Sequence, residues 1–114
     1  MVGEEALNLM KPNAVLINTA RGGIIDQKAL VTALKEEKIR GAVLDVLETE
    51  PPQPDDELLR LDNVFLSPHA AFYSEESKRE LKVRAAQVVV AALKGEAPRN
   101  LLNPEVLTSA ARRW

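Results

Sequence analysis

Short apolar runs alternate with longer amphipathic segments along this chain, a pattern typical of β-α-β units. Three of the apolar runs predict strands, at Ala14–Asn18, Ala42–Val46 and Val64–Leu66. The first run follows a Lys-Pro-Asn turn and is apolar throughout until its last residue. A continuous apolar run of this kind predicts a strand that is buried on both faces, as strands of parallel sheets are.

The segments between these runs predict helices and one loop. Asp26 is a candidate N-cap for a helix that extends to about Lys38, in which Leu30, Ala33 and Leu34 share one face. Three prolines and no periodicity predict a loop over residues 48–56. The other helical segments are Glu4–Met10, a short turn at Glu57–Leu61, and a long helix from the Ser74 cap to Lys94 and Gly95 with an apolar stripe of Leu81, Ala85, Val88 and Ala92.

These elements predict an α/β fold with three parallel strands and crossover helices. A sheet of three strands has two open edges, and right-handed crossovers place helices on its faces. We therefore expect the chain to form part of a larger, doubly wound domain.

Composition and charge limit the classes of function that this chain can have. The chain has 114 residues, of which 46% are hydrophobic and 28% charged, and its net charge is −2. This balance predicts a soluble, cytoplasmic domain with no direct affinity for nucleic acid or a membrane surface. There is no cysteine, which excludes disulfides and cysteine-bound zinc, and we expect no bound metal. The longest nearly apolar run, residues 85–93, is too short to span a bilayer.

Polar residues stand at or just beyond the carboxyl ends of all three predicted strands. Arg21 follows the first strand, Asp45 and Glu50 the second, and His69 the third. In open α/β sheets ligands bind outside these strand ends, so the four side chains are expected to converge. Taken singly, a lone arginine is usually a surface ion-pair partner and a lone histidine is usually structural or merely exposed.

Together these residue types favour chemistry on an acidic substrate. An arginine binds a carboxylate through two parallel hydrogen bonds, and a histidine held by a glutamate transfers a proton near neutral pH. Asp45 lies within an apolar run, where a buried carboxylate is costly without hydrogen-bond donors.

The segment Met10–Asp26, MKPNAVLINTARGGIID, resembles the third signature of the D-isomer-specific 2-hydroxyacid dehydrogenases. The later motifs GAVLDV at 41–46, Glu50-Pro51 and Ser67-Pro68-His69 follow in that family's order and approximate spacing. The resemblance implies the C-terminal portion of a Rossmann-type nucleotide-binding domain, an NAD or NADP cofactor, and hydride transfer between 2-keto and 2-hydroxy acids.

The resemblance also implies the role of each site residue. Arg21 would bind the substrate carboxylate and polarise its carbonyl, His69 would be the acid and base, and Glu50 would orient the imidazole. The cofactor-binding residues would be Thr19, Ala20, Arg21, Asp45, His69 and Ala71. Many family members have two glycines after the histidine, whereas this chain has Ala70 and Ala71.

Residues 68–77, PHAAFYSEES, are similar to the C-terminal-binding-protein branch of the family. That branch includes transcriptional corepressors as well as bacterial dehydrogenase-like relatives. The sequence therefore leaves open a second function, a dinucleotide-sensing binding protein with little or no turnover. For Phe72 and Tyr73, packing that orients the long helix and a role in the substrate pocket have equal weight.

Glycines occur only at positions 3, 22, 23, 41 and 95, so the chain contains no Gly-x-Gly-x-x-Gly phosphate motif. We expect it to be the C-terminal piece of a dehydrogenase that is a homodimer at full length. Residues 1–97 would complete the nucleotide-binding domain, and residues 98–114 would return to a substrate domain. The substrate acid and the choice between NAD and NADP are not readable from this chain.

Overall fold

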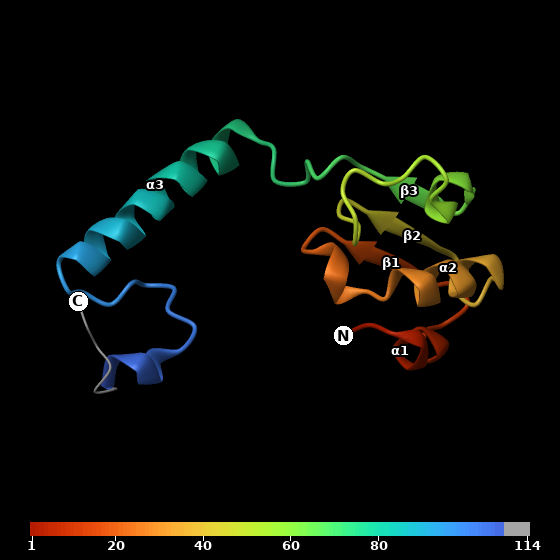
Figure 1. Cartoon of the computed structure of the whole chain (residues 1–114), viewed down its shortest axis with the longest axis horizontal. Coiled ribbons are helices and arrows are strands. Elements are labelled where there is room, and N and C mark those ends of the chain that lie inside the picture. Colours follow the sequence, from red (N-terminus) through yellow and green to blue (C-terminus); the bar gives the residue numbers. More distant parts are fainter. Residues whose placement is uncertain (109–114) are drawn as a thin grey trace. The chain divides into compact units, whose positions relative to one another are not determined.

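The computed structural model describes residues 1–108 and divides the chain into two compact units (Figure 1). The first unit is Met1–Ala71, and the second begins at Phe72. The predicted boundary near residue 97 separates the nucleotide-binding domain of a complete protein from a segment that returns to a substrate domain. It stays a prediction. We describe each unit by itself.

The first unit contains a three-stranded parallel sheet in the order β1-β2-β3. Its strands are β1 at Val15–Asn18, β2 at Gly41–Leu44 and β3 at Val64–Leu66, close to the predicted runs. Asn18 pairs with Leu44, and Leu44 pairs with Leu66, so the three strands end side by side. The predicted parallel α/β fold is confirmed. Asp45 lies just beyond β2 rather than within it.

Two α-helices and two 3₁₀ turns accompany the sheet: α1 at Glu4–Asn8, η1 at Gly22–Ile24, α2 at Gln27–Lys35 and η2 at Glu57–Arg60. The predicted cap of α2 is confirmed, since the Asp26 carboxylate accepts a hydrogen bond from the Ala29 amide at 3.0 Å. The helix stops at Lys35, short of the predicted Lys38, because Glu37 adopts a left-handed φ of 53°.

The hydrophobic core lies between α1, α2 and one face of the sheet. The predicted inner face of α2 is buried there together with residues of the other elements, and the largest fully buried side chains are Leu7, Leu30, Leu34, Ile39 and Leu58. Ala42 and Leu44 of β2 belong to the same cluster.

The opposite face of the sheet is open in this unit, so the prediction that β1 is buried on both faces is wrong. Ile17 and Phe65 are each 65% exposed, and Val15 is also exposed. Side chains alternate along a strand, and the register aligns Ile17, Val43 and Phe65 in one row on this face. The apolar composition of β1 therefore reflects a surface that nothing in the first unit covers.

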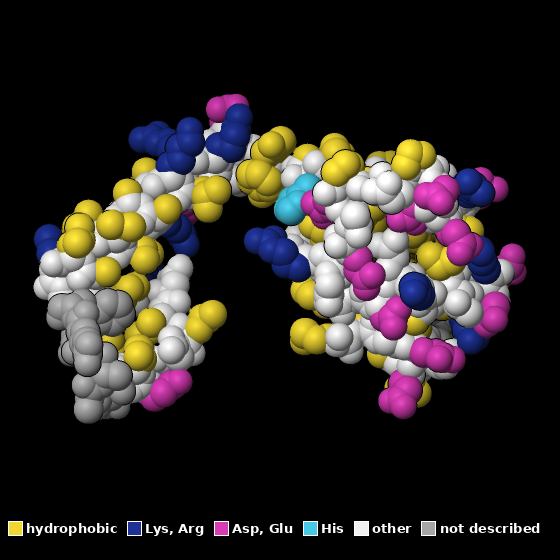
Figure 2. Space-filling model, viewed as in Figure 1, with side chains coloured by type: hydrophobic (Ala, Val, Ile, Leu, Met, Phe, Trp, Pro, Cys, Tyr) yellow, Lys and Arg dark blue, Asp and Glu magenta, His cyan; other side chains and the backbone are white. Residues whose placement is uncertain are grey.

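The second unit contains α3, Glu75–Leu93, and the 3₁₀ turn η3, Pro104–Thr108. As predicted, Ser74 caps α3, accepting from the Ser77 amide at 3.0 Å, and Gly95 follows the helix with a φ of 71°. Hydrophobic side chains are exposed along α3 (Figure 2), and most of the predicted apolar stripe, including Leu81 and Val88, is among the exposed residues. Among residues 1–108, no helix has both the length and the apolar character needed to cross a lipid bilayer.

Candidate active site

The loop after β1 is shaped by Asn18, the last residue of that strand. Its buried side chain donates to the Arg21 carbonyl at 2.9 Å and accepts from the Ala20 amide at 3.0 Å. The Asn18 amide group thereby folds the chain into an Asx turn that fixes the backbone of Thr19, Ala20 and Arg21. Asn18 is not among the predicted site residues, although a polar residue that ends an apolar strand is a signal for such a role.

Arg21 follows this turn and lies on the surface of the unit. Its Nη1 donates to the Ala20 carbonyl at 2.7 Å. That hydrogen bond uses one of the five guanidinium N–H donors, so the guanidinium group retains donors for a carboxylate.

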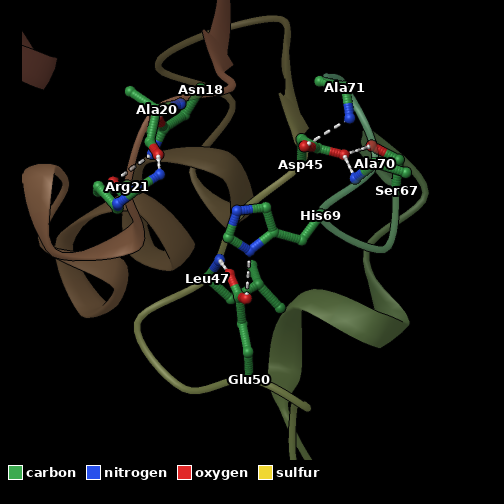
Figure 3. A network of polar contacts seen from close by, with 10 residues as sticks. All are labelled: Asn18, Ala20, Arg21, Asp45, Leu47, Glu50, Ser67, His69, Ala70 and Ala71. Carbon is green, nitrogen blue, oxygen red and sulfur yellow. Dashed lines mark hydrogen bonds and ion pairs between the residues drawn. The ribbon is translucent and has the colours of Figure 1, made fainter. Parts of the chain in front are cut away.

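Glu50 and His69 are in direct contact, as predicted. The Glu50 Oε2 atom lies 2.7 Å from Nδ1 of His69, and Oε1 accepts from the Leu47 amide at 2.9 Å (Figure 3). The imidazole hydrogen bond, followed by the Leu47 amide, holds the pKa of Glu50 below its usual value. The ionised carboxylate fixes the Nδ1–H tautomer of His69, and proton transfer then falls to Nε2.

Asp45 joins the end of β2 to the turn that carries His69. Its buried carboxylate accepts from the Ser67 hydroxyl at 2.5 Å and from the amides of Ala70 and Ala71 at 2.8 and 2.9 Å. The hydrogen bond from Ser67 is the largest cause that lowers the pKa of Asp45, followed by the two amides. This set of donors is the compensation that a carboxylate with 4% exposure requires.

The loop that carries Glu50 is anchored to the start of α2 through Gln27. The backbone amide of Gln27 donates to the Glu48 carboxylate at 3.2 Å, and the backbone amide of Glu48 donates to the side-chain carbonyl of Gln27 at 3.3 Å. Nε2 of Gln27 also donates to Asp56 at 2.9 Å. The role of Gln27 was not predictable, because nothing in the local sequence pattern indicates a hydrogen bond to a loop 21 residues away.

The structure thus brings the predicted residues to one edge of the sheet (Figure 3). In that view the Glu50–His69 pair lies between the loop of Asn18, Ala20 and Arg21 and the turn around Asp45. Among the described residues, no three His, Asp or Glu side chains are grouped so that they could hold a metal ion. Phe72 and Tyr73 stack edge-to-face with ring centroids 4.4 Å apart, which leaves both of their predicted roles open.

A three-stranded parallel sheet with polar residues at its carboxyl ends defines this unit as a piece of a nucleotide-binding α/β fold of the Rossmann type. The family model described as "D-isomer specific 2-hydroxyacid dehydrogenase, NAD binding domain" matches residues 1–71. The chain belongs to this family. Because the match ends at Ala71, the likeness of residues 68–77 to the C-terminal-binding-protein branch stays a prediction.

Curated relatives carry reductase and dehydrogenase names. The chain is 52% identical over 107 residues to a glyoxylate reductase of Korarchaeum cryptofilum, covering 94% of this chain and 32% of that protein. It is 48% identical over 103 residues to a D-3-phosphoglycerate dehydrogenase of Methanocaldococcus jannaschii, covering 90% of this chain and 20% of the relative. The chain therefore spans a third or less of the length of these relatives.

Solved structures show the same fold. An acyclic imino acid reductase in complex with NADPH and D-Arg superposes with a TM-score of 0.74 at 40% identity, covering 87% of this chain and 31% of that one. An NADPH-dependent glyoxylate/hydroxypyruvate reductase from Sinorhizobium meliloti, in complex with citrate, gives a TM-score of 0.72 at 40% identity, covering 84% and 31%. The Rossmann-type fold predicted from the sequence is confirmed.

Proposed function

We propose that this chain supplies the acid–base and substrate-binding residues of an NAD- or NADP-dependent reductase that converts a small 2-keto acid to the D-2-hydroxy acid. The observation that carries the proposal is the 2.7 Å contact between His69 Nδ1 and Glu50 Oε2 at the carboxyl edge of the sheet. The reductase names of the relatives support this reaction class.

The residues of this chain divide the chemistry between them. His69 in its protonated form donates a proton from Nε2 to the carbonyl oxygen of the substrate. Glu50 stabilises that protonated form, because its carboxylate lies 2.7 Å from Nδ1 of the imidazole. Arg21 binds the substrate carboxylate and stabilises the negative charge that grows on the carbonyl oxygen.

The residues present fit the nicotinamide end of the cofactor but not its pyrophosphate. The backbone groups of residues 19–21, which the Asn18 side chain holds in place, and the exposed imidazole of His69 would hold the nicotinamide end, and the bound nicotinamide would supply the hydride. The Asp45 carboxylate and the Ala71 amide are hydrogen-bonded to each other, so their part would be to hold the turn of His69 in place beside the ring. The start of α2 is already occupied, because the carboxylates of Asp26 and Glu48 accept from its amides. The pyrophosphate site would have to come from outside this chain, which has no glycine-rich phosphate motif.

Assembly as a homodimer and a location in the cytoplasm belong to the same proposal. The exposed apolar side chains of the sheet support contact with further protein, and the net charge of −2 gives no general attraction to nucleic acid.

The test measures reduction of a panel of 2-keto acids with NADH and NADPH by the full-length protein that contains this chain. Turnover that falls by about 10²- to 10⁴-fold in His69→Ala supports the proposal. Reduction by His69→Ala at the unchanged rate would overturn the site, and cofactor binding without any turnover would favour dinucleotide sensing.

A further inference from the structure

The turn that presents His69 is held by one buried side chain. Within residues 1–108, the hydrogen bonds of the Asp45 carboxylate come from residues 67–71: the hydroxyl of Ser67 and the amides of Ala70 and Ala71. The backbone carbonyl of Asp45 accepts from the His69 amide at 2.9 Å as well. Asp45 therefore contacts the turn on both sides of the histidine, and we call this group of hydrogen bonds the Asp45 clasp (Figure 3).

The clasp holds His69 in a conformation that the backbone does not favour by itself. His69 has a φ of 52°, in the left-handed region that side chains other than glycine rarely adopt. Such conformations persist where several contacts with the surrounding structure hold the backbone in place. Here the Ala70 and Ala71 amides, directly after His69, are fixed on the two oxygens of one carboxylate.

Ser67 is the one side-chain donor of the clasp, since the others are backbone amides. Its hydroxyl reaches Oδ1 of Asp45, the same oxygen that accepts from Ala70. A donor to an ionised carboxylate is stronger than a neutral hydrogen bond, and it keeps the carboxylate charged. The lowered pKa of Asp45, whose largest cause is Ser67, agrees with this geometry.

We propose that Ser67 is a positioning residue for His69: its hydroxyl orients the Asp45 carboxylate, which fixes the left-handed turn and directs the imidazole onto Glu50. The catalytic importance of this role rests on the proposed function, in which His69 is the proton donor. The structural claim does not rest on it, because it concerns the conformation of the turn without substrate.

The experiment is NMR spectroscopy on the 114-residue chain, in which His69 is the only histidine and gives a single imidazole signal. Ser67→Ala removes the hydroxyl, Ser67→Thr retains it, and Thr49→Ala removes an exposed hydroxyl beside Glu50 as the matched control. In each variant, amide hydrogen exchange is measured at Ala70 and Ala71, and at Leu34 in α2 as an internal reference.

We expect Ser67→Ala to accelerate exchange at Ala70 and Ala71 by about tenfold or more, with Leu34 unchanged. The pKa of Asp45, read from its carboxyl carbon, should rise toward its ordinary value, and the His69 imidazole signal should shift. Ser67→Thr should restore the unsubstituted values, and Thr49→Ala should leave them unaltered.

Unchanged exchange at Ala70 and Ala71 in Ser67→Ala would overturn the inference. Equal acceleration at Leu34 would also overturn it, because Ser67 would then serve overall stability and not the turn. None of these measurements depends on turnover. The inference about Ser67 can therefore fail while the proposed reductase activity holds, and the reductase activity can fail while the inference holds.

Discussion

Gly22 lies directly against the backbone of Leu47, so closely that a Cβ added to Gly22 would overlap the Leu47 carbonyl group. This contact joins the loop that carries Arg21 to the loop that carries Glu50. The Leu47 amide donates to Glu50, so the backbone of one residue both limits the first loop and orients the acid of the second. The absence of a side chain at Gly22 is therefore a condition for the arrangement of the site.

Gly22→Ala should lower the free energy of unfolding by about 1–3 kcal/mol, because the loops must separate to admit the methyl group. Gly23→Ala is the matched control. A Cβ at Gly23 would meet nothing within 4 Å, and its φ lies outside the left-handed region. We expect that variant to be stabilised by about 0.4–1 kcal/mol through a less flexible unfolded chain. Urea unfolding followed by circular dichroism measures both, and equal effects would contradict the contact.

The sequence predicted the elements of the first unit well, because strong local signals specify them. The run at β1, the Asp26 cap and the prolines of residues 48–56 each act through their immediate neighbours. The Glu50–His69 pair was also predictable, since parallel strands bring their carboxyl ends to one edge.

Other features depend on contacts that the local pattern does not contain. The helix end at Lys35 is set by the left-handed Glu37, and an ordinary charged residue gives no warning of that conformation. The hydrogen bonds of Gln27 and Ser67 join segments about 20 residues apart, so they depend on the folded chain and not on the local sequence pattern. The exposed face of β1 is another case. A run of apolar residues shows that burial would be favourable, but it does not show which part of a protein buries them.

That open sheet face predicts self-association of the chain. Ile17 and Phe65 form an exposed apolar row with Val43, and such a surface favours contact with other protein. The double variant Ile17→Thr, Phe65→Thr retains residues that suit a strand and removes most of the apolar area. Sedimentation velocity should show a shift toward monomer. Leu9→Thr, which changes an exposed leucine outside the sheet, should not shift the distribution; an equal shift in both variants would contradict a role for the sheet face.

The Asp45 clasp should open in acid. The pKa of Asp45 is lowered in the folded chain, chiefly by the Ser67 hydroxyl, so its ionised form stabilises the fold above the ordinary aspartate value. This contribution is fully present above about pH 4 and is lost as the pH falls through the lowered folded-state pKa.

Asp45→Asn should therefore be less stable than the unsubstituted chain at neutral pH, and the difference should shrink as the pH falls below about 4. Urea midpoints across this range measure the difference. Asp55→Asn changes an exposed aspartate and should show no such convergence. A constant stability difference between Asp45→Asn and the unsubstituted chain at all pH values would show that the charge of Asp45 is not what holds the turn.

Glu50 and His69 make a further prediction about the pH dependence of turnover in the full-length protein. The Glu50 carboxylate lies 2.7 Å from Nδ1 of His69, and an adjacent negative charge favours the protonated imidazole. Reduction of a keto acid needs that protonated form. In Glu50→Gln the decline of kcat/KM with rising pH should begin at a lower pH, with a smaller loss of rate near the new optimum.

Asp55→Asn is the matched control for this measurement, since it removes one exposed negative charge from the loop of residues 48–56 and leaves the imidazole contact intact. A general effect of charge on the site would move both profiles toward lower pH by similar amounts. A specific effect of the 2.7 Å hydrogen bond moves only the profile of Glu50→Gln. If the two variants give the same profile, Glu50 does not tune His69, and the assignment of these residues as an acid–base pair fails even where turnover itself is observed.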